Sequence, residues 1–192
     1  TTTSAFQLTD NFLDATHIAT THVDSFAVTD SMYLPPHDVT VDGVRAWTTY
    51  DILYKNYDDP LVETGEHPLA QPQVLYKEFG AVSNALIRLD HPLTGKRIAI
   101  LFALQPEHDG STRIFKQMAR NDYDGDAQKI AASIVFEDLV MDEDLFVLES
   151  YAEMGVHLDL RVEVHTRTDK LSVAYRRMLA AFVAGTVPAA VA

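Results

Sequence analysis

Alternating hydrophobic and polar residues predict a block of β-strands in the middle of the chain. Residues 37–53 alternate in this way on both sides of Asp42 and Gly43, a dipeptide that favours the tight turn of a β-hairpin. Residues 54–72 are polar, acidic and contain prolines, so we expect a long excursion over the surface or a lid over a pocket. Further strands are predicted in four segments, which are residues 73–79, 82–90, 97–105 and 112–119.

Two helices are predicted after these strands. Asp126 is a suitable N-cap for a long helix that runs to about residue 150. In residues 169–183 apolar side chains recur every three or four positions, and Gly185 follows just past the end, as is typical of a helix C-terminus. Hairpin-linked strands followed by helices predict an α+β fold with an antiparallel sheet, and the length fits a single domain over residues 1–192.

The composition excludes several classes of function. With a formal net charge of −13, the chain lacks the concentration of lysine and arginine that binding to a nucleic-acid backbone requires. No apolar run approaches the roughly twenty residues that cross a bilayer, and "TTTSAFQ" lacks the basic and apolar regions of a signal peptide, so we expect a cytoplasmic protein. The absence of cysteine rules out disulfides, thiolate nucleophiles and a cysteine-ligated iron–sulfur cluster within this chain.

Polar residues near the N-terminus are the first candidates for chemistry. Residues 10–23 are predicted to form a helix, on which Asp14 and His17 share one face because they are three positions apart. His22 lies five positions beyond His17, well off that line on an undistorted helix, so the two rings converge only if the helix bends or a partner element enters between them. Taken alone, such a pair is more typical of capping or of buried structural histidines than of a metal site.

The long helix carries an acidic segment, "EDLVMDEDLFVLES", that offers a third metal ligand. Asp144 has only apolar residues three and four positions away, so an unpaired charge there would be costly and metal ligation would satisfy it. Glu143 has four apolar neighbours as well, so periodicity leaves the choice between the two open, whereas Asp138 and Asp142 fit a solvated face. Two neutral imidazoles and one carboxylate, with further positions open, suit non-haem Fe(II) and the activation of O₂.

Three segments of the chain resemble the same enzyme family. "NFLDATHIATTH" resembles the N-x-x-D-x-x-H-x-x-x-x-H signature of the catalytic domain of Rieske-type non-haem iron oxygenases. "MARNDYDGD" and the acidic helix after it resemble the second half of that domain. "LDLRVEVHTRTDKLSVAYRRML" is similar to the tail typical of the demethylase and monooxygenase branch, the vanillate- and methylxanthine-demethylase-like oxygenases. The resemblance runs from about residue 8 to residue 183.

The resemblance implies a role for each matching residue. His17 and His22 would ligate mononuclear Fe(II), and Asp144 would be the carboxylate ligand, which resolves the choice left open above. Asp14 would bridge a ligand histidine to the Rieske [2Fe–2S] cluster of a neighbouring subunit in a homotrimer, and Asn11 would be a polar group close to the metal. The implied fold is the helix-grip (START-like) type, in which a curved antiparallel sheet surrounds a long C-terminal helix.

The implied activity is monooxygenation of a small, largely apolar or aromatic substrate, by hydroxylation or by loss of an O- or N-methyl group, with O₂ as co-substrate. Because this chain has no cysteine, we expect the N-terminal Rieske domain to be absent from it, and the electrons to come from a Rieske domain or from a ferredoxin and its reductase. One alternative is a non-catalytic module that binds a hydrophobic ligand, since helix-grip folds also serve as carriers. Another is a subunit similar to the small subunits of ring-hydroxylating dioxygenases, which are not expected to retain the ligand set.

The other histidines are expected at exposed positions in loops, turns and strand ends, where polar side chains are commonest. They are His37, His67, His91, His108, His157 and His165.

Overall fold

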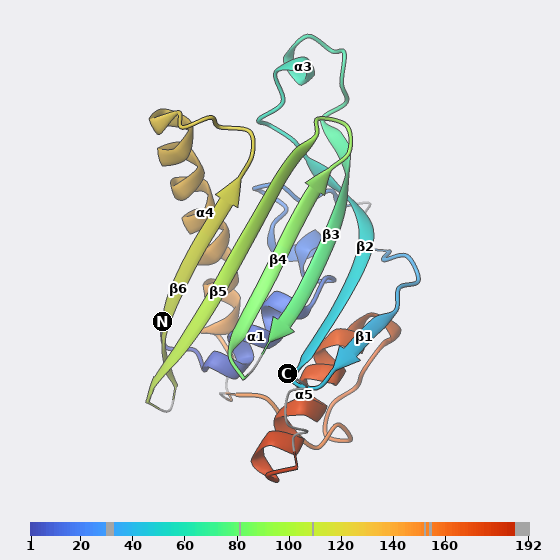
Figure 1. Cartoon of the computed structure of the whole chain (residues 1–192), viewed down its shortest axis with the longest axis vertical. Helices are drawn as coiled ribbons and strands as arrows, with labels where there is room; N and C mark the ends of the chain where they lie inside the picture. The colour runs from blue at the N-terminus through green and yellow to red at the C-terminus, as the bar shows by residue number, and fades with distance from the viewer. Residues whose placement is uncertain (30–32, 81, 109, 152, 154, 187–192) are drawn as a thin grey trace.

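A six-stranded antiparallel sheet forms the centre of the computed structural model, which describes residues 1–192 except 30–32, 81, 109, 152, 154 and 187–192 (Figure 1). The strands follow one another in the sheet in chain order, each paired with the next. Hairpin links between neighbours explain this order, because antiparallel strands need only a short connection. The strands are β1 (Val39–Asp42), β2 (Arg45–Lys55), β3 (Ala70–Gly80), β4 (Asn84–His91), β5 (Lys96–His108) and β6 (Ser111–Arg120).

Helices lie on one face of this sheet and along its edges (Figure 1). The helix α1 packs on β3, β4 and β5, α5 packs on β1 and β2, and side-chain hydrogen bonds such as Arg120 to Ser133 link α4 to β6. No helix in the described part of the chain is long and apolar enough to cross a membrane. The helices are α1 (Ala5–Leu13), α2 (Ile18–Thr21), α3 (Pro60–Glu63), α4 (Ala127–Leu148) and α5 (Lys170–Val183), with a 3₁₀ turn at Arg167–Asp169.

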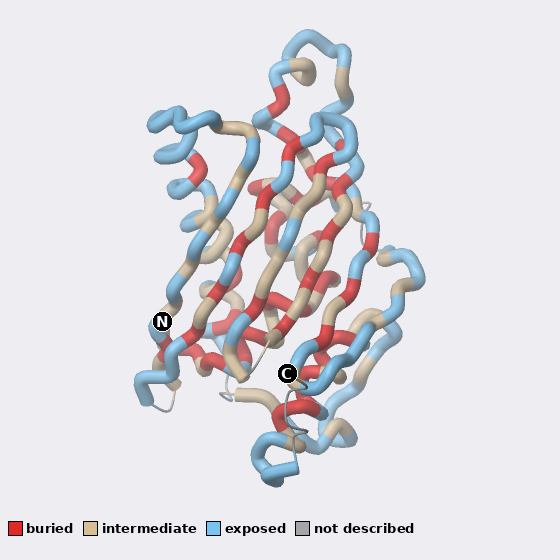
Figure 2. Tube along the Cα trace, in the orientation of Figure 1, coloured by how far each residue is buried: buried red, intermediate tan, exposed pale blue. Residues whose placement is uncertain are grey.

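The face of the sheet that packs against α1, called here the inner face, carries the core. Buried and more exposed residues alternate along the strands, as expected when side chains point to opposite faces in turn (Figure 2). Phe12 of α1 stacks on Phe102 of β5 with ring centroids 4.1 Å apart. This contact anchors α1, and with it the start of the polar segment that follows, over the middle of the sheet.

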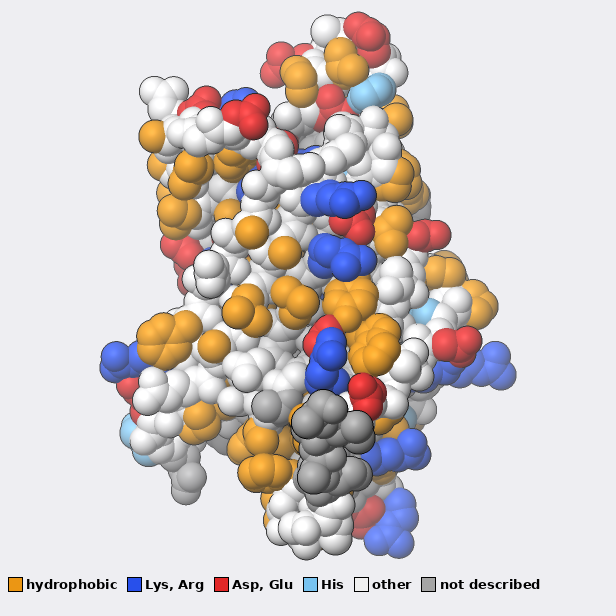
Figure 3. All heavy atoms as spheres, in the orientation of Figure 1, with side chains coloured by type: hydrophobic (Ala, Val, Ile, Leu, Met, Phe, Trp, Pro, Cys, Tyr) orange, Lys and Arg blue, Asp and Glu red, His pale blue; other side chains and the backbone are white. Residues whose placement is uncertain are grey.

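The opposite face of the sheet is turned to solvent and mixes hydrophobic with charged side chains (Figure 3). The guanidinium of Arg88 lies 4.8 Å from the centroid of the Tyr76 ring and pairs with Asp90 at 3.2 Å. The contact of Arg88 with Tyr76 crosses from β4 to β3, and cross-strand pairs of this kind stabilise a sheet. One solvated and one buried face are what the alternating pattern predicts for an antiparallel sheet.

Most predicted elements are confirmed, including the α+β class, the hairpin at Asp42 and Gly43 and the N-cap at Asp126. The helix predicted over residues 10–23 is wrong. Its first part, α1, begins at Ala5, and the chain leaves the helical conformation at Asp14 before the short α2. The prediction for His91 is also wrong, because this side chain lies buried on the inner face.

Candidate metal centre

The turn between α1 and α2 is built by the side chain of Asp14. Its carboxylate accepts hydrogen bonds from the backbone N–H groups of Thr16, at 3.0 Å, and His17, at 2.9 Å. An aspartate that captures N–H groups two and three positions ahead favours a new helix start, so α1 ends here. The ammonium group of the buried Lys77 donates to the Asp14 carbonyl oxygen from below. The helix therefore breaks at this turn, before both histidines, and His17 and His22 then flank the single short turn of α2.

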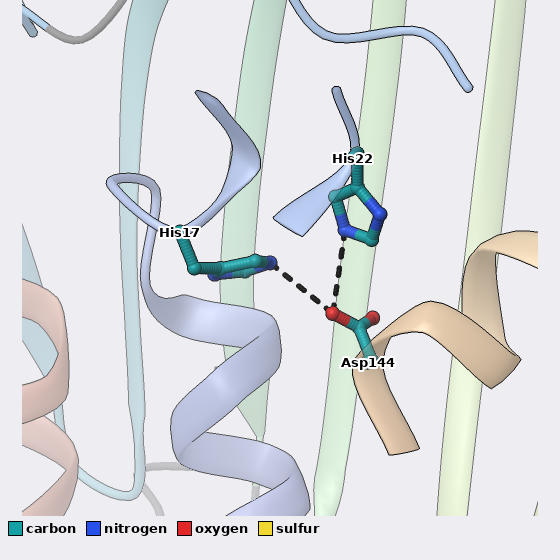
Figure 4. A group of neighbouring side chains, drawn as sticks. All are labelled: His17, His22 and Asp144. Carbon is teal, nitrogen blue, oxygen red and sulfur yellow. Dashed lines mark ion pairs between the residues drawn. The ribbon is translucent and has the colours of Figure 1, made fainter. Parts of the chain in front are cut away.

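His17 and His22 converge on Asp144, which α4 contributes from the other side of the site (Figure 4). One donor atom of each of the three side chains lies within 4.8 Å of the other two. Asp144 Oδ1 lies 3.4 Å from His17 Nε2 and 3.3 Å from His22 Nε2. Asp144 is buried although most of α4 is exposed. Carboxylates are rarely buried unless they are paired, so its burial indicates a functional role.

Two further carboxylates fix the orientation of the two imidazole rings. Asp14 Oδ2 lies 3.0 Å from His17 Nδ1, and Glu143 Oε2 lies 2.7 Å from His22 Nδ1. Because a carboxylate accepts, each Nδ1 carries a proton in these contacts, so in the neutral ring each Nε2 keeps its lone pair toward Asp144. Carboxylate–histidine pairs of this kind hold metal-binding rings in place and raise their basicity.

The three inward atoms fit a cation. Two Nε2 lone pairs and a carboxylate oxygen repel one another unless a proton or a metal ion stands between them. Asp144 Oδ1 is buried and has no hydrogen-bond partner among the described residues, although both rings are close. Two imidazole nitrogens and one carboxylate oxygen are the ligand types and number of a facial iron site, so the residues present fit that metal.

The pKa shifts at the site favour a negatively charged Asp144, which suits binding of a cation. Burial raises the pKa of the Asp144 carboxyl. His22, His17 and Asn11 lower this pKa by more than burial raises it, so the net shift is downward. Burial lowers the pKa of His22, and Asp144 and Glu143 outweigh this and raise it. The carboxylate is therefore ionised at neutral pH.

The two remaining predicted site residues lie beside this cluster. Burial raises the pKa of Asp14, but hydrogen bonding and charge from His17 lower it well below its usual range. The side chain of Asp14 is 27% exposed, so it connects His17 with the surface of the protein. The buried amide nitrogen of Asn11 faces the Asp144 carboxylate, whose pKa it lowers, and it has no other hydrogen-bond partner among the described residues.

A cavity of about 320 Å³ opens from the three converging residues and runs along the inner face of the sheet. Phe12, Leu75 and Phe102 are among the apolar side chains that line it, and polar side chains gather at the part lined by β2, β4 and β5. Its volume lies in the range of small-molecule sites.

Sequence reasoning missed two contributors. Glu143 was weighed against Asp144 as a ligand, whereas the structure gives the two neighbouring carboxylates different places, one against His22 Nδ1 and one among the inward atoms. Lys77 gave no signal because it sits in an ordinary alternating strand, and only its full burial under Asp14 marks it. A paired acidic motif on a helix with apolar flanks is the pattern that pointed toward Glu143.

Comparison with protein families gives one match over most of the chain. The family model described as the vanillate O-demethylase oxygenase C-terminal domain matches residues 2–185. No curated protein gives a significant match to the chain.

Solved structures share the fold. NdmA of Pseudomonas putida CBB5, in a structure with caffeine, superposes with a TM-score of 0.71 and 21% identity, covering 91% of this chain and 47% of NdmA. NdmB of the same organism superposes with a TM-score of 0.66 and 20% identity, covering 94% of this chain and 48% of NdmB. At this level of identity the likeness establishes the fold. This chain spans less than half the length of either protein.

Proposed function

Because the chain belongs to the vanillate O-demethylase oxygenase C-terminal domain family, we propose that residues 1–192 form the iron-binding catalytic domain of a Rieske-type non-haem iron oxygenase. Its fold would be of the helix-grip type. His17, His22 and Asp144 would hold Fe(II). The observation that supports this most strongly is the convergence of their three donor atoms, with a further carboxylate on the outer nitrogen of each ring.

The protein's own residues would position the metal and keep the site dry. Fe(II) held by two imidazoles and a carboxylate supplies the activation of O₂. Asp14 and Glu143 would hold the Nδ1 protons of His17 and His22, so that both Nε2 atoms stay free to ligate. The apolar wall formed by residues such as Phe12 and Phe102 would exclude water and place a largely apolar substrate beside the metal.

The reaction would be monooxygenation, either hydroxylation or removal of an O- or N-methyl group. A hydroxylated methyl carbon attached to oxygen or nitrogen releases formaldehyde, and the demethylated substrate remains. Family membership and the apolar cavity both favour a small, largely apolar or aromatic substrate.

Electrons would come from a Rieske [2Fe–2S] cluster that this cysteine-free chain does not hold. Asp14 is suited to receive them, because its carboxylate both contacts His17 and reaches the surface. In a homotrimer, a Rieske domain associated with one subunit would place its cluster beside the Asp14 of the next. The exposed apolar side chains of α4, among them Val135 and Phe146, are available for contacts between subunits or domains.

The test of this proposal is the iron content of protein purified anaerobically and offered Fe(II). We expect about one iron per chain for the wild type. His17→Ala should lose most of it, because one of three ligands is removed, while circular dichroism stays unchanged. His157→Ala, at an exposed position, serves as the matched control and should bind iron like the wild type. Full iron loading of His17→Ala would contradict the proposal.

A second function, a non-catalytic carrier of a hydrophobic ligand, is favoured by the apolar cavity alone. It makes the opposite prediction for the same measurement. A carrier would bind no iron, and Asp144→Leu would leave it equally stable or stabilise it, because a buried charge would be replaced by an apolar side chain.

A further inference from the structure

A row of buried polar side chains crosses the inner face of the sheet within the same cavity. Register places His91 of β4 directly opposite Lys96 of β5, and the amide nitrogen of Gln73 on β3 lies 3.5 Å from His91 Nε2. All three side chains are at least nine-tenths buried and line the cavity that begins at His17, His22 and Asp144. We call these three residues the polar row.

Two further rows separate the polar row from the metal centre. The next row along the strands is apolar and consists of Leu75, Leu89 and Ile98. The row after it contains Lys77, whose ammonium group contacts the Asp14 turn. Gln73 and Lys77 are four residues apart on β3, which corresponds to about 13 Å along the sheet. One cavity therefore has a metal end and a polar end, with an apolar wall between them.

Lys96 is a buried cation that is only weakly paired, and its ammonium group lies 5.5 Å from the centroid of the Tyr54 ring. Its ammonium group donates to Asn56 Oδ1 at 3.1 Å, and its nearest carboxylate is that of Asp58 at 3.8 Å, on a side chain that is 59% exposed. Arg120 differs, because it donates two hydrogen bonds to Asp122, at 3.0 and 2.8 Å, and one to Ser133. Desolvation makes a buried, weakly paired ammonium group unfavourable, and an oxyanion within hydrogen-bond distance would offset that penalty.

His91 and Tyr54, which lie beside Lys96, each have a hydrogen-bond donor without a partner among the described residues. An amide nitrogen donates, so His91 Nε2 accepts from Gln73 and the proton of the neutral ring is on Nδ1, which has no partner in the described structure. Burial, together with the cations Lys96 and Arg120, lowers the pKa of His91 to about 3, so the ring stays neutral. The hydroxyl of Tyr54, whose ring packs against His91, also lacks a partner there. Both unpaired groups can therefore donate a hydrogen bond, which suits a ligand that accepts.

We propose that the polar row is a substrate-binding subsite in which Lys96, with His91 and Tyr54 beside it, binds the carboxylate of an elongated apolar substrate. The body of that substrate lies along Leu75, Leu89 and Ile98, and its oxidised group reaches the metal end. The distance between the two ends requires a body longer than a single aromatic ring. This inference rests on the proposed oxygenase function for the identity of the metal end, and its test is a binding measurement that does not depend on turnover.

The experiment compares three probes by isothermal titration calorimetry with Fe(II)-loaded protein under anaerobic conditions. The probes are 6-methoxy-2-naphthoate, 2-methoxynaphthalene, which lacks the carboxylate and is called here the headless probe, and the shorter 4-methoxybenzoate. We expect the naphthoate to bind at least ten-fold more tightly than either of the others. In Lys96→Met, and in the more conservative Lys96→Gln, the advantage of the naphthoate over 2-methoxynaphthalene should fall below about three-fold. Lys116→Met removes a lysine that pairs with Asp138 outside the cavity, and should behave like the wild type.

Iron content and thermal unfolding of each variant separate the possible failures. If iron loading fails in the wild type, the oxygenase proposal fails, and the same titrations without metal still test the subsite. If folded Lys96→Gln binds the naphthoate as tightly as the wild type, or if the headless probe binds as well as the naphthoate, the subsite is refuted. If 4-methoxybenzoate binds as tightly as the naphthoate, the elongated substrate is refuted.

Discussion

Glu143 should control iron affinity without touching the metal. Its Oε2 lies 2.7 Å from His22 Nδ1 and 2.8 Å from Ser25 Oγ, so one oxygen serves both donors. Glu143→Gln can place its amide oxygen at the same point and loses only the charge. Glu143→Leu removes the acceptor and leaves the Nδ1–H of the buried His22 unpaired. The two variants therefore separate the effect of charge from that of orientation.

The expected magnitudes follow from these contacts. Loss of an outer-shell partner typically weakens metal binding by about 10- to 100-fold. We expect Glu143→Gln near the lower limit and Glu143→Leu near the upper one, since an unsatisfied buried donor adds about 1–3 kcal/mol. A 100-fold change corresponds to about 2.7 kcal/mol.

The assay is an anaerobic competition between the protein and a chromophoric Fe(II) chelator. Asp142→Asn is the matched control, because Asp142 is an exposed neighbour on the same helix, and its affinity should stay within about two-fold of the wild type. Circular dichroism and thermal unfolding establish that each variant is folded. If folded Glu143→Leu binds Fe(II) within two-fold of the wild type, the assignment of Glu143 as the orienting partner of His22 is refuted.

Three further predictions address the core, the buried lysine and the metal. Phe12→Ala removes the stack on Phe102 and should lower the free energy of unfolding by about 3–5 kcal/mol in urea denaturation; a loss under 1 kcal/mol would contradict the packing described. Burial lowers the pKa of Lys77 from 10.5 to about 8, so the unfolded chain binds more protons between these values. Stability should therefore rise from pH 8 to pH 10.5, and Lys77→Met should remove that part of the rise, whereas an unchanged slope would show that Lys77 does not cause it. Fe(II) at 100 times its dissociation constant should stabilise the wild type by about 2.7 kcal/mol, and the same metal concentration should leave the melting temperature of Asp144→Asn almost unchanged; an equal shift in both would argue against Asp144 as a ligand.

The sheet and the long helix were predictable because their signals are local. Alternation and the Asp42–Gly43 turn define the hairpin, and Asp126 caps α4 through its own side chain. The N-terminal helix was mispredicted because the side chain of Asp14 competes with the helical hydrogen-bond pattern and starts a new turn. Helical periodicity continues through that turn in the sequence, so it conceals the break.

The sequence named the residues of the candidate site, and the structure shows that their side chains converge. The family resemblance named His17, His22 and Asp144, whereas the spacing of the two histidines alone favoured a structural role. The contact of α4 with α2 that brings Asp144 beside them was not predictable. His91 was expected to be exposed because it ends a strand. It is buried because strand register sets it opposite Lys96 on the inner face, and register over several strands is not encoded in any single segment.

The most direct test of the account is a crystal structure of the Fe(II)-loaded protein with anomalous diffraction measured at the iron absorption edge. The account predicts one anomalous peak per chain, in contact with His17 Nε2, His22 Nε2 and Asp144, with Glu143 still hydrogen-bonded to His22 Nδ1. A crystal of the loaded protein with no peak between these three side chains, or with iron bound elsewhere on the chain, would contradict it.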